Sequence, residues 1–333
     1  MNVVESSTAT MEAVKLDLRF TGDTRIEPSS ALECQISDKF VSARRKQLER
    51  FNDPDFDLPS MPPCVTKVVE ISQSPDPSPR ALEQVLQLDQ ALAAKILRMA
   101  NSPIYGGTRR IDTLQSAITR LGVVSIRNVV LAIAVNSTIK SDSRIGPVAN
   151  VLWEHSISTG IAAQVLAKRL RLPEQAAFLL GLMHDIGKLP AWILLQELLP
   201  PKSPVRHEML STLVEDSHCE IGEALIDAWD MSFDIRTVVG WHHSVTSLNA
   251  LYGHILCERP EMASSDAKAL AALICCVVLA DRALGALKLA PEPGVFQIGG
   301  TTLATDLGLS VQESLDYLAG LPEILKSNDF RNM

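Results

Sequence analysis

Residues 181–189 read GLMHDIGKL and place His184 directly before Asp185 at the end of an apolar run. An imidazole and a carboxylate adjacent in sequence can reach the same one or two metal ions where the backbone forms a helix end. Lys188 follows His184 by four residues and would share its face in a continuous helix. Gly187 allows close packing beside the motif. The alternative is an ordinary capped helix with a surface lysine, and these nine residues alone leave both open.

Helical periodicity surrounds this motif along most of the chain. In residues 80–102, apolar side chains recur at steps of three and four with a break near Asp89, which predicts two short helices. Residues 112–122 and 124–139 carry two more helical patterns, the first starting at Asp112 as a plausible N-cap. No segment shows sustained strict alternation, and no repeat of fixed period is found. We therefore expect an all-α multi-helix bundle with little or no sheet.

The proline-rich segment LPSMPP, which begins at residue 58, predicts a hinge into a folded domain. Residues 1–57 are expected to form an N-terminal extension, in which the charged stretch 39–50 is compatible with an amphipathic helix. Residues 289–333 are expected to form a C-terminal tail that is helical again. The folded domain between them should span residues 58–288.

Composition limits the classes of partner and compartment. A net charge of −8 and a pI near 5.4 argue against binding nucleic acid by phosphate neutralisation, which requires a basic surface. Six cysteines without a CxxC pair, and an N-terminus without an export signal, favour a reduced, cytoplasmic setting. The most apolar stretch, residues 269–280, is about half as long as a membrane span requires and is closed by Asp281 and Arg282. It predicts a buried core helix rather than a membrane span.

Further histidines have both a structural and a functional interpretation. His242 and His243 follow Gly240-Trp241 before a loop, where paired histidines are often only polar loop residues. His218 lies in the first turn of an amphipathic helix, three residues before the apolar Ile221. Ser217 and Glu220 have the spacing of a capping box there. His155 opens the amphipathic stretch 156–170. Taken singly, His155 and His218 are more often structural than ligands.

Asp281 differs in kind because it follows twelve uncharged residues in a helix that must be buried. An ionised carboxylate there is costly unless it is paired or binds a cation. Arg282 is the ordinary alternative partner. The order of the candidates along the chain resembles the H…HD…D pattern of the HD superfamily, with the extra histidines of its two-metal members; they are His155, His184, Asp185, His218, His242, His243 and Asp281.

Two sets of motifs together resemble the HDOD domain family. Residues 58–72, 86–107 and 111–122 are similar to its N-terminal helical half, expected over 58–145. WEHS, AFLLGLMHDIGKL, HCEIGEALIDAW and GWHH are similar to its HD-like half, expected over 146–288. The resemblance implies a multi-helix bundle with a role in bacterial signal transduction or regulation. It also implies that the protein acts mainly through contacts with other signalling proteins, and many members are thought to lack enzymatic activity.

The related HD-GYP phosphodiesterases imply the roles of single residues. By that likeness the seven candidates fall on ligand positions, and Lys188 falls on the position that contacts substrate phosphate or the bridging water. Asp185 and Lys188 would then be the catalytic residues. Residues 244–253 lack the Gly-Tyr-Pro signature, and Val151 stands where tri-metal members have a glutamate. Hydrolysis of cyclic di-GMP and a third ion are therefore not expected.

Two hypotheses follow from these residues. In the first, the protein is a regulatory HDOD protein whose histidine and aspartate cluster holds a metal or persists as a polar core network. In the second, it is a metal-dependent phosphohydrolase or phosphodiesterase acting on a phosphorylated small molecule or nucleotide. Imidazole and carboxylate ligands suit iron, manganese or zinc. We expect two such divalent ions, which would polarise a phosphoryl oxygen.

Overall fold

The computed structural model describes residues 30–51, 63–74, 76–101, 110–140, 146–199, 207–229, 231–289 and 301–327. All regular secondary structure in these ranges is helical, and they contain no strand. The predicted all-α class is therefore confirmed. Most of the proline-rich hinge that begins at residue 58 lies outside the described residues.

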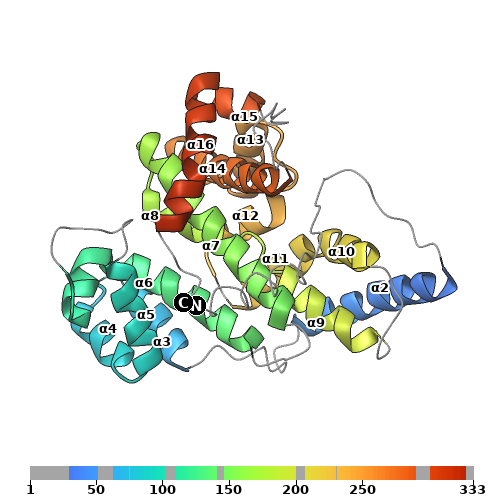
Figure 1. The fold of residues 1–333 in the computed structure, drawn as a ribbon, viewed down its shortest axis with the longest axis horizontal. Coiled ribbons are helices and arrows are strands. Elements are labelled where there is room, and N and C mark those ends of the chain that lie inside the picture. The colour runs from blue at the N-terminus through green and yellow to red at the C-terminus, as the bar shows by residue number, and fades with distance from the viewer. Residues whose placement is uncertain are drawn as a thin grey trace, which may run out of the picture.

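Four helices of the N-terminal half are grouped at one end of the molecule (Figure 1). They are α3 (Pro63–Gln73), α4 (Pro79–Leu86), α5 (Gln90–Ala100) and α6 (Leu114–Lys140). The break predicted near Asp89 is confirmed, because its Oδ1 accepts a hydrogen bond of 3.0 Å from Leu92 N and so caps α5. Leu82, Ile96 and Ile126 are fully buried among these helices.

The start of α6 differs from the expectation. Asp112 was predicted as its N-cap, but Thr113 Oγ1 accepts the hydrogen bond from Ser116 N at 3.2 Å, while Asp112 pairs with Arg110. Gly122 has a φ of 78° inside α6 and divides it into two helical stretches. This agrees with the two separate helical patterns in the sequence, since only glycine adopts that backbone readily.

The HD-like half contributes eight helices around a second apolar core. They are α7 (Gly146–Arg169), α8 (Glu174–Met183), α9 (Lys188–Leu198), α10 (His207–Glu215), α11 (His218–Ala228), α12 (Phe233–Trp241), α13 (Leu248–Glu258) and α14 (Ser264–Leu289). Helix α7 packs along α8 and α14 and also touches α6, so it joins the two halves. Ile157 and Ile161 of α7 lie in the apolar cluster of the N-terminal half.

Two apolar segments of this half are core elements. Residues 269–280 lie within α14 and are largely buried, as predicted. The segment Glu174–Leu198 is long and apolar enough to cross a membrane by composition, but 83% of its most apolar window is buried inside the protein. A turn at residues 184–187 also divides it into α8 and α9. Both segments have the burial expected of core helices.

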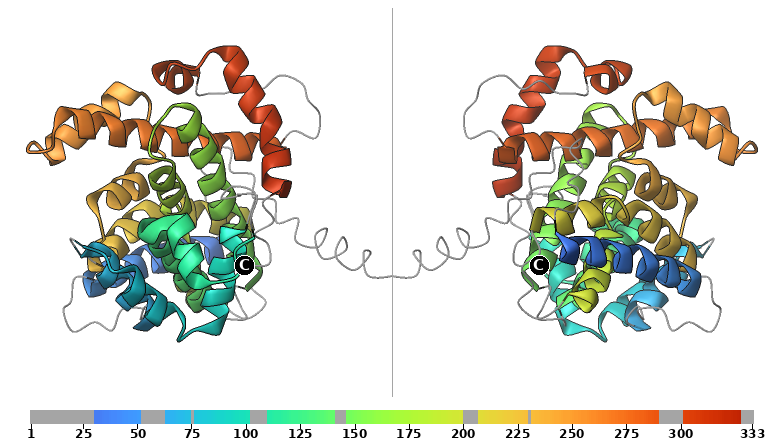
Figure 2. Two further views of the ribbon diagram at one scale, coloured as in Figure 1. Left: turned by 90° about the vertical axis from the view of Figure 1, so that its left-hand side faces the viewer. Right: turned by 90° about the vertical axis from the view of Figure 1, so that its right-hand side faces the viewer.

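Flanking helices pack onto the HD-like half. Helix α2 (Ala31–Phe51) contacts α9, α10 and α11, and its Ile36 and Phe40 are fully buried in the same core. The predicted helix at residues 39–50 is therefore confirmed. Helix α15 (Thr301–Asp306) packs on α14, and helix α16 (Val311–Ser327) runs from there past α14 to α7 (Figures 1 and 2). Tyr317 of α16 donates a hydrogen bond of 2.8 Å to Ala162 O of α7.

Glycines set the closest helix contacts near the HD motif. A Cβ added to Gly181 in α8 would lie 2.8 Å from Gly160 Cα in α7, so only glycine permits this approach. A Cβ on Gly187 would lie 1.9 Å from His218 O and 2.6 Å from Gly222 N at the start of α11. These two crossings bring α7, the turn after α8 and the start of α11 together.

Candidate metal centre

The structure brings all seven predicted ligand residues into one cluster. His155 lies in α7, His184 and Asp185 lie in the turn after α8, and His218 begins α11. The remaining three follow in the C-terminal part of this half: His242 and His243 directly after α12, and Asp281 in α14. Their convergence is observed, whereas their role as metal ligands stays a prediction.

Asp185 lies at the centre and faces two pairs of histidines. Its Oδ2 lies 3.5 Å from His155 Nε2 and 3.3 Å from His184 Nε2. Its Oδ1 lies 3.5 Å from His218 Nε2 and 3.4 Å from His242 Nε2. Each carboxylate oxygen of Asp185 thus faces a different pair of histidines, which divides the cluster into two groups of side chains.

We call the residues around Asp185 Oδ2, which are His155, His184 and Asp281, the first half of the cluster. The second half consists of His218, His242 and His243 around Asp185 Oδ1. Asp281 completes the first half. Its Oδ1 lies 3.0 Å from His155 Nε2 and 3.8 Å from His184 Nε2. The buried-charge argument from the sequence therefore found a carboxylate that faces imidazoles. Arg282, the ordinary alternative partner, donates a hydrogen bond of 3.1 Å to Val245 O.

Backbone carbonyl groups orient three of the imidazoles. Nδ1 lies 2.7 Å from Gly181 O in His184, 2.9 Å from Glu215 O in His218 and 3.0 Å from Val238 O in His242. A carbonyl oxygen can only accept, so each Nδ1 donates and, in the neutral ring, Nε2 keeps a lone pair. Metal-ligating histidines are commonly held in this way by the nitrogen that does not bind the ion.

The unsatisfied atoms of the cluster fit a cation. His218 Nε2 and His242 Nε2 lie 3.3 Å apart, so in the neutral tautomer two lone pairs face each other. His184 Nε2 and Asp185 Oδ1 are buried without a hydrogen bond, whereas Asp185 Oδ2 faces the ammonium group of Lys188 at 2.8 Å. Buried polar atoms are normally satisfied, and a divalent ion in each half would satisfy these.

The pKa values of His218 and His242 keep both imidazoles in the neutral form that can bind a metal ion. Burial lowers the pKa of His218 to about 3 and that of His242 to about 4, so both are neutral near pH 7. Burial alone would raise the pKa of Asp185, but His184 and Lys188 hold it well below its usual range. Burial would likewise lower the pKa of His184, but Asp185 raises it. The Asp185 carboxylate thus favours the protonated form of His184, which an ion bound beside it would disfavour.

Lys188 contacts Asp185 but does not share the predicted helical face with His184. Residues 184–187 form a turn and Lys188 begins α9, so the expectation of one continuous helical face with His184 is wrong. Its Nζ nevertheless lies 2.8 Å from Asp185 Oδ2, and its side chain is only 8% exposed. The alternative of a surface lysine is therefore wrong as well. Burial would lower the pKa of Lys188, but Asp185 and Glu215 raise it, so the amine stays charged.

Glu215 is the acidic residue that the sequence did not indicate. Its Oε1 lies 2.7 Å from Lys188 Nζ, and its Oε2 lies 3.5 Å from His243 Nε2. Burial would raise the pKa of Glu215, but Lys188 lowers it to about 2. Glu215 ends α10 three residues before His218, so a search for acidic residues one helical turn from each histidine would have found it.

The start of α11 also departs from the predicted capping box. Ser217 makes no cap hydrogen bond; its Oγ donates to Leu213 O at 2.7 Å and accepts from Arg44 of α2 at 3.2 Å. Glu220 pairs with Arg44 at 3.5 Å instead of bonding back to the cap. A contact from a helix distant in sequence has replaced the local one.

Comparison with known families places the cluster in context. The family model of the HDOD domain matches residues 58–245 of this chain. The chain belongs to the HDOD domain family. The matched HDOD segment contains six of the seven ligand candidates, and Asp281 lies beyond it on α14.

Solved structures with the same fold include other HDOD-like chains. A crystal structure from Shewanella amazonensis SB2B named "Putative metal-dependent phosphohydrolase" is 23% identical with a TM-score of 0.63, covering 88% of this chain and 100% of its own. An HDOD domain protein with unknown function from Geobacter sulfurreducens is 22% identical with a TM-score of 0.58, covering 87% and 99%. A "Putative signal transduction protein" from Marinobacter aquaeolei VT8 is 18% identical with a TM-score of 0.55, covering 89% and 66%. At these identities the likeness shows the fold.

A curated relative extends beyond the matched region. An uncharacterized protein of Treponema pallidum (strain Nichols) is 24% identical in an alignment of 202 positions that covers 57% of this chain. The match covers only 38% of that relative. The chain therefore matches less than half of the length of this relative.

Proposed function

We propose that this chain is a regulatory HDOD protein that holds two divalent ions in its HD-like half and acts mainly through contacts with other signalling proteins. The metal centre rests on one observation, the two oxygens of Asp185, each facing its own pair of histidines. The regulatory role is supported by the family and by the name of the Marinobacter structure.

One ion would be held by His155, His184, Asp281 and Oδ2 of Asp185. The other would be held by His218, His242, His243 and Oδ1 of Asp185. The carboxylates of Asp185 and Glu215 lie 2.8 and 2.7 Å from the ammonium group of Lys188, and that of Asp281 lies 3.0 Å from His155 Nε2. Three carboxylates beside one ammonium group leave the cluster attractive to cations. Iron, manganese and zinc all accept such ligands.

A second function, phosphoester hydrolysis, is favoured by the position of Lys188. Its charged Nζ lies beside the central carboxylate, where it would attract the phosphate of a small molecule or nucleotide and stabilise charge that develops on oxygen. Bound ions would polarise the phosphoryl group and lower the pKa of water. The name of the Shewanella structure agrees with this chemistry. Residues 244–253 lack Gly-Tyr-Pro, so cyclic di-GMP is not the substrate we propose.

Metal analysis of the purified full chain tests the centre. We expect two ions per chain in the wild type and almost none in Asp185→Asn. Asp76→Asn, which changes an exposed aspartate of the N-terminal half, is the matched control and should keep both ions. Wild-type protein that binds no divalent ion after reconstitution would overturn the proposal.

A panel of phosphodiesters and phosphomonoesters then separates the two functions. Turnover that is present in the metal-loaded wild type and lost in a His184→Ala, Asp185→Ala double variant would establish the hydrolase. Metal binding without turnover, together with capture of a signalling partner that the double variant binds less well, would establish the regulatory module. No turnover and an unchanged set of partners in the double variant would contradict both.

A further inference from the structure

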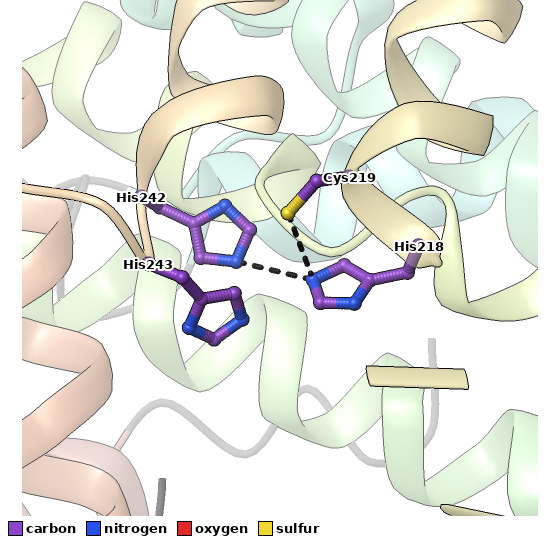
Figure 3. Close-up of side chains that lie close together, drawn as sticks. All are labelled: His218, Cys219, His242 and His243. Carbon is purple, nitrogen blue, oxygen red and sulfur yellow. Dashed lines mark hydrogen bonds between the residues drawn. The ribbon is translucent and has the colours of Figure 1, made fainter. Parts of the chain in front are cut away.

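A sulfur atom lies at the second half of the cluster. Cys219 Sγ lies 3.5 Å from His218 Nε2, and Figure 3 shows it directed at that nitrogen. The ligand atoms of His218, Cys219, His242 and His243 all lie within 4.8 Å of one another. One ion at this position could touch all four.

Other buried groups beside Cys219 also favour a bound metal ion at this position. Asp185 Oδ1 is buried, makes no hydrogen bond, and faces His218 and His242 at 3.5 and 3.4 Å. The two Nε2 lone pairs of these histidines face each other across 3.3 Å. The sulfur therefore borders a position where one buried carboxylate oxygen and two imidazole nitrogens direct lone pairs toward one another.

We propose that Cys219 binds the ion of this half as a thiolate, which makes the two halves of the centre chemically unlike. The first half offers only nitrogen and oxygen, from His155, His184, Asp185 and Asp281. Thiolate is a soft ligand that favours zinc or iron over magnesium and manganese. The inference rests on the proposed metal centre and adds a ligand and a metal preference to it.

The binding step changes no oxidation state. The thiol proton leaves to solvent as the bond between sulfur and the ion forms, because a coordinating thiol is deprotonated. The competing interpretation is that Cys219 only fills space as a small apolar side chain. The two interpretations differ in whether sulfur touches the ion, which spectroscopy reports directly.

Cobalt(II) reconstitution of the full chain provides that report. We expect a near-ultraviolet charge-transfer band from sulfur to cobalt in the wild type and in Cys257→Ser, which changes an exposed free cysteine of α13. Cys219→Ser should lose this band while the visible bands of bound cobalt persist. Bound cobalt without a sulfur band in the wild type would overturn the role of Cys219 and leave the metal centre standing. No bound cobalt would overturn the centre itself.

Two further measurements make the outcome independent of one variant. In the wild type, zinc should protect Cys219 from iodoacetamide while Cys257 reacts at an unchanged rate, as followed by mass spectrometry of the two peptides. In Cys219→Ser, the Kd for zinc in one of the two sites should rise by about tenfold or more. Equal alkylation of Cys219 with and without bound zinc would contradict thiolate binding.

Discussion

The contact between Gly187 and the start of α11 predicts a coupled loss of stability and metal binding in Gly187→Ala. The new Cβ would lie 1.9 Å from His218 O and 2.6 Å from Gly222 N, both of them backbone atoms. Ordinary van der Waals contact begins at 3.4 Å, so α11 and the turn after α8 must separate by more than 1 Å. No side-chain rotation relieves the overlap, because backbone atoms cause it.

Overpacking of this kind costs about 3 kcal/mol in the free energy of unfolding. The displaced carbonyl belongs to His218, so the imidazole moves away from Asp185 with it. A misplaced ligand of this kind weakens metal affinity by about tenfold or more. The same substitution should therefore lower both stability and the metal content of the second half.

Denaturant unfolding and metal analysis of Gly187→Ala measure the two effects. Gly253→Ala in α13 is the matched control, because a Cβ there meets nothing within 4 Å. Replacing a helical glycine by alanine in open space should leave stability equal or raise it by about 1 kcal/mol. Wild-type stability and two bound ions in Gly187→Ala would refute the close contact between the turn and α11.

Three further predictions concern the cluster. His155→Ala and His242→Ala should each retain one of two ions, counted by mass spectrometry under native conditions; loss of both ions from either variant would argue against separate halves. The pKa values of His218 and His242, about 3 and 4, lie below the 6.5 of the unfolded chain, so between these values the unfolded state binds more protons. Metal-free protein should therefore become less stable as pH falls from about 6.5 to 4, and each histidine should lower the free energy of unfolding by up to about 1.4 kcal/mol per pH unit. In denaturant titrations, the stability of a His218→Gln, His242→Gln variant should depend less on pH. Lys188→Met should lower the free energy of unfolding of the metal-free protein by about 3 kcal/mol, because the substitution leaves the carboxylate of Glu215 without its partner at 2.7 Å. Adding Glu215→Gln to the same chain should restore part of this stability.

The helix class could be predicted from the sequence because it depends on local signals, whereas most ligand candidates were predicted from the resemblance of their order to the HD superfamily pattern. The recurrence of apolar residues around Asp89 reports a buried face for each short helix. Asp281 was found because a charge after twelve apolar or uncharged residues needs a partner whatever that partner is. Neither inference requires knowing which helices touch.

Other features depended on contacts between segments distant in sequence. Arg44 of α2 binds Ser217 and Glu220, which removed a capping box of correct spacing. Glu215, at the end of α10, meets Lys188 at the start of α9 only because both helices pack beside α11. The orientation of Cys219 toward His218 Nε2 likewise appears only in the folded chain.

The sequence by itself determined the all-helical class, since the hydrophobic period is a property of short segments, and its resemblance to the HD superfamily implied which imidazoles and acids belong together. Tertiary structure alone decided that Asp185 divides those ligands into two halves and that Lys188 and Glu215 form a buried pair beside them. The physical reason is that such distances are set by close contacts between helices, as at Gly160 with Gly181 and at Gly187 with Gly222. No local pattern encodes which two glycines will meet.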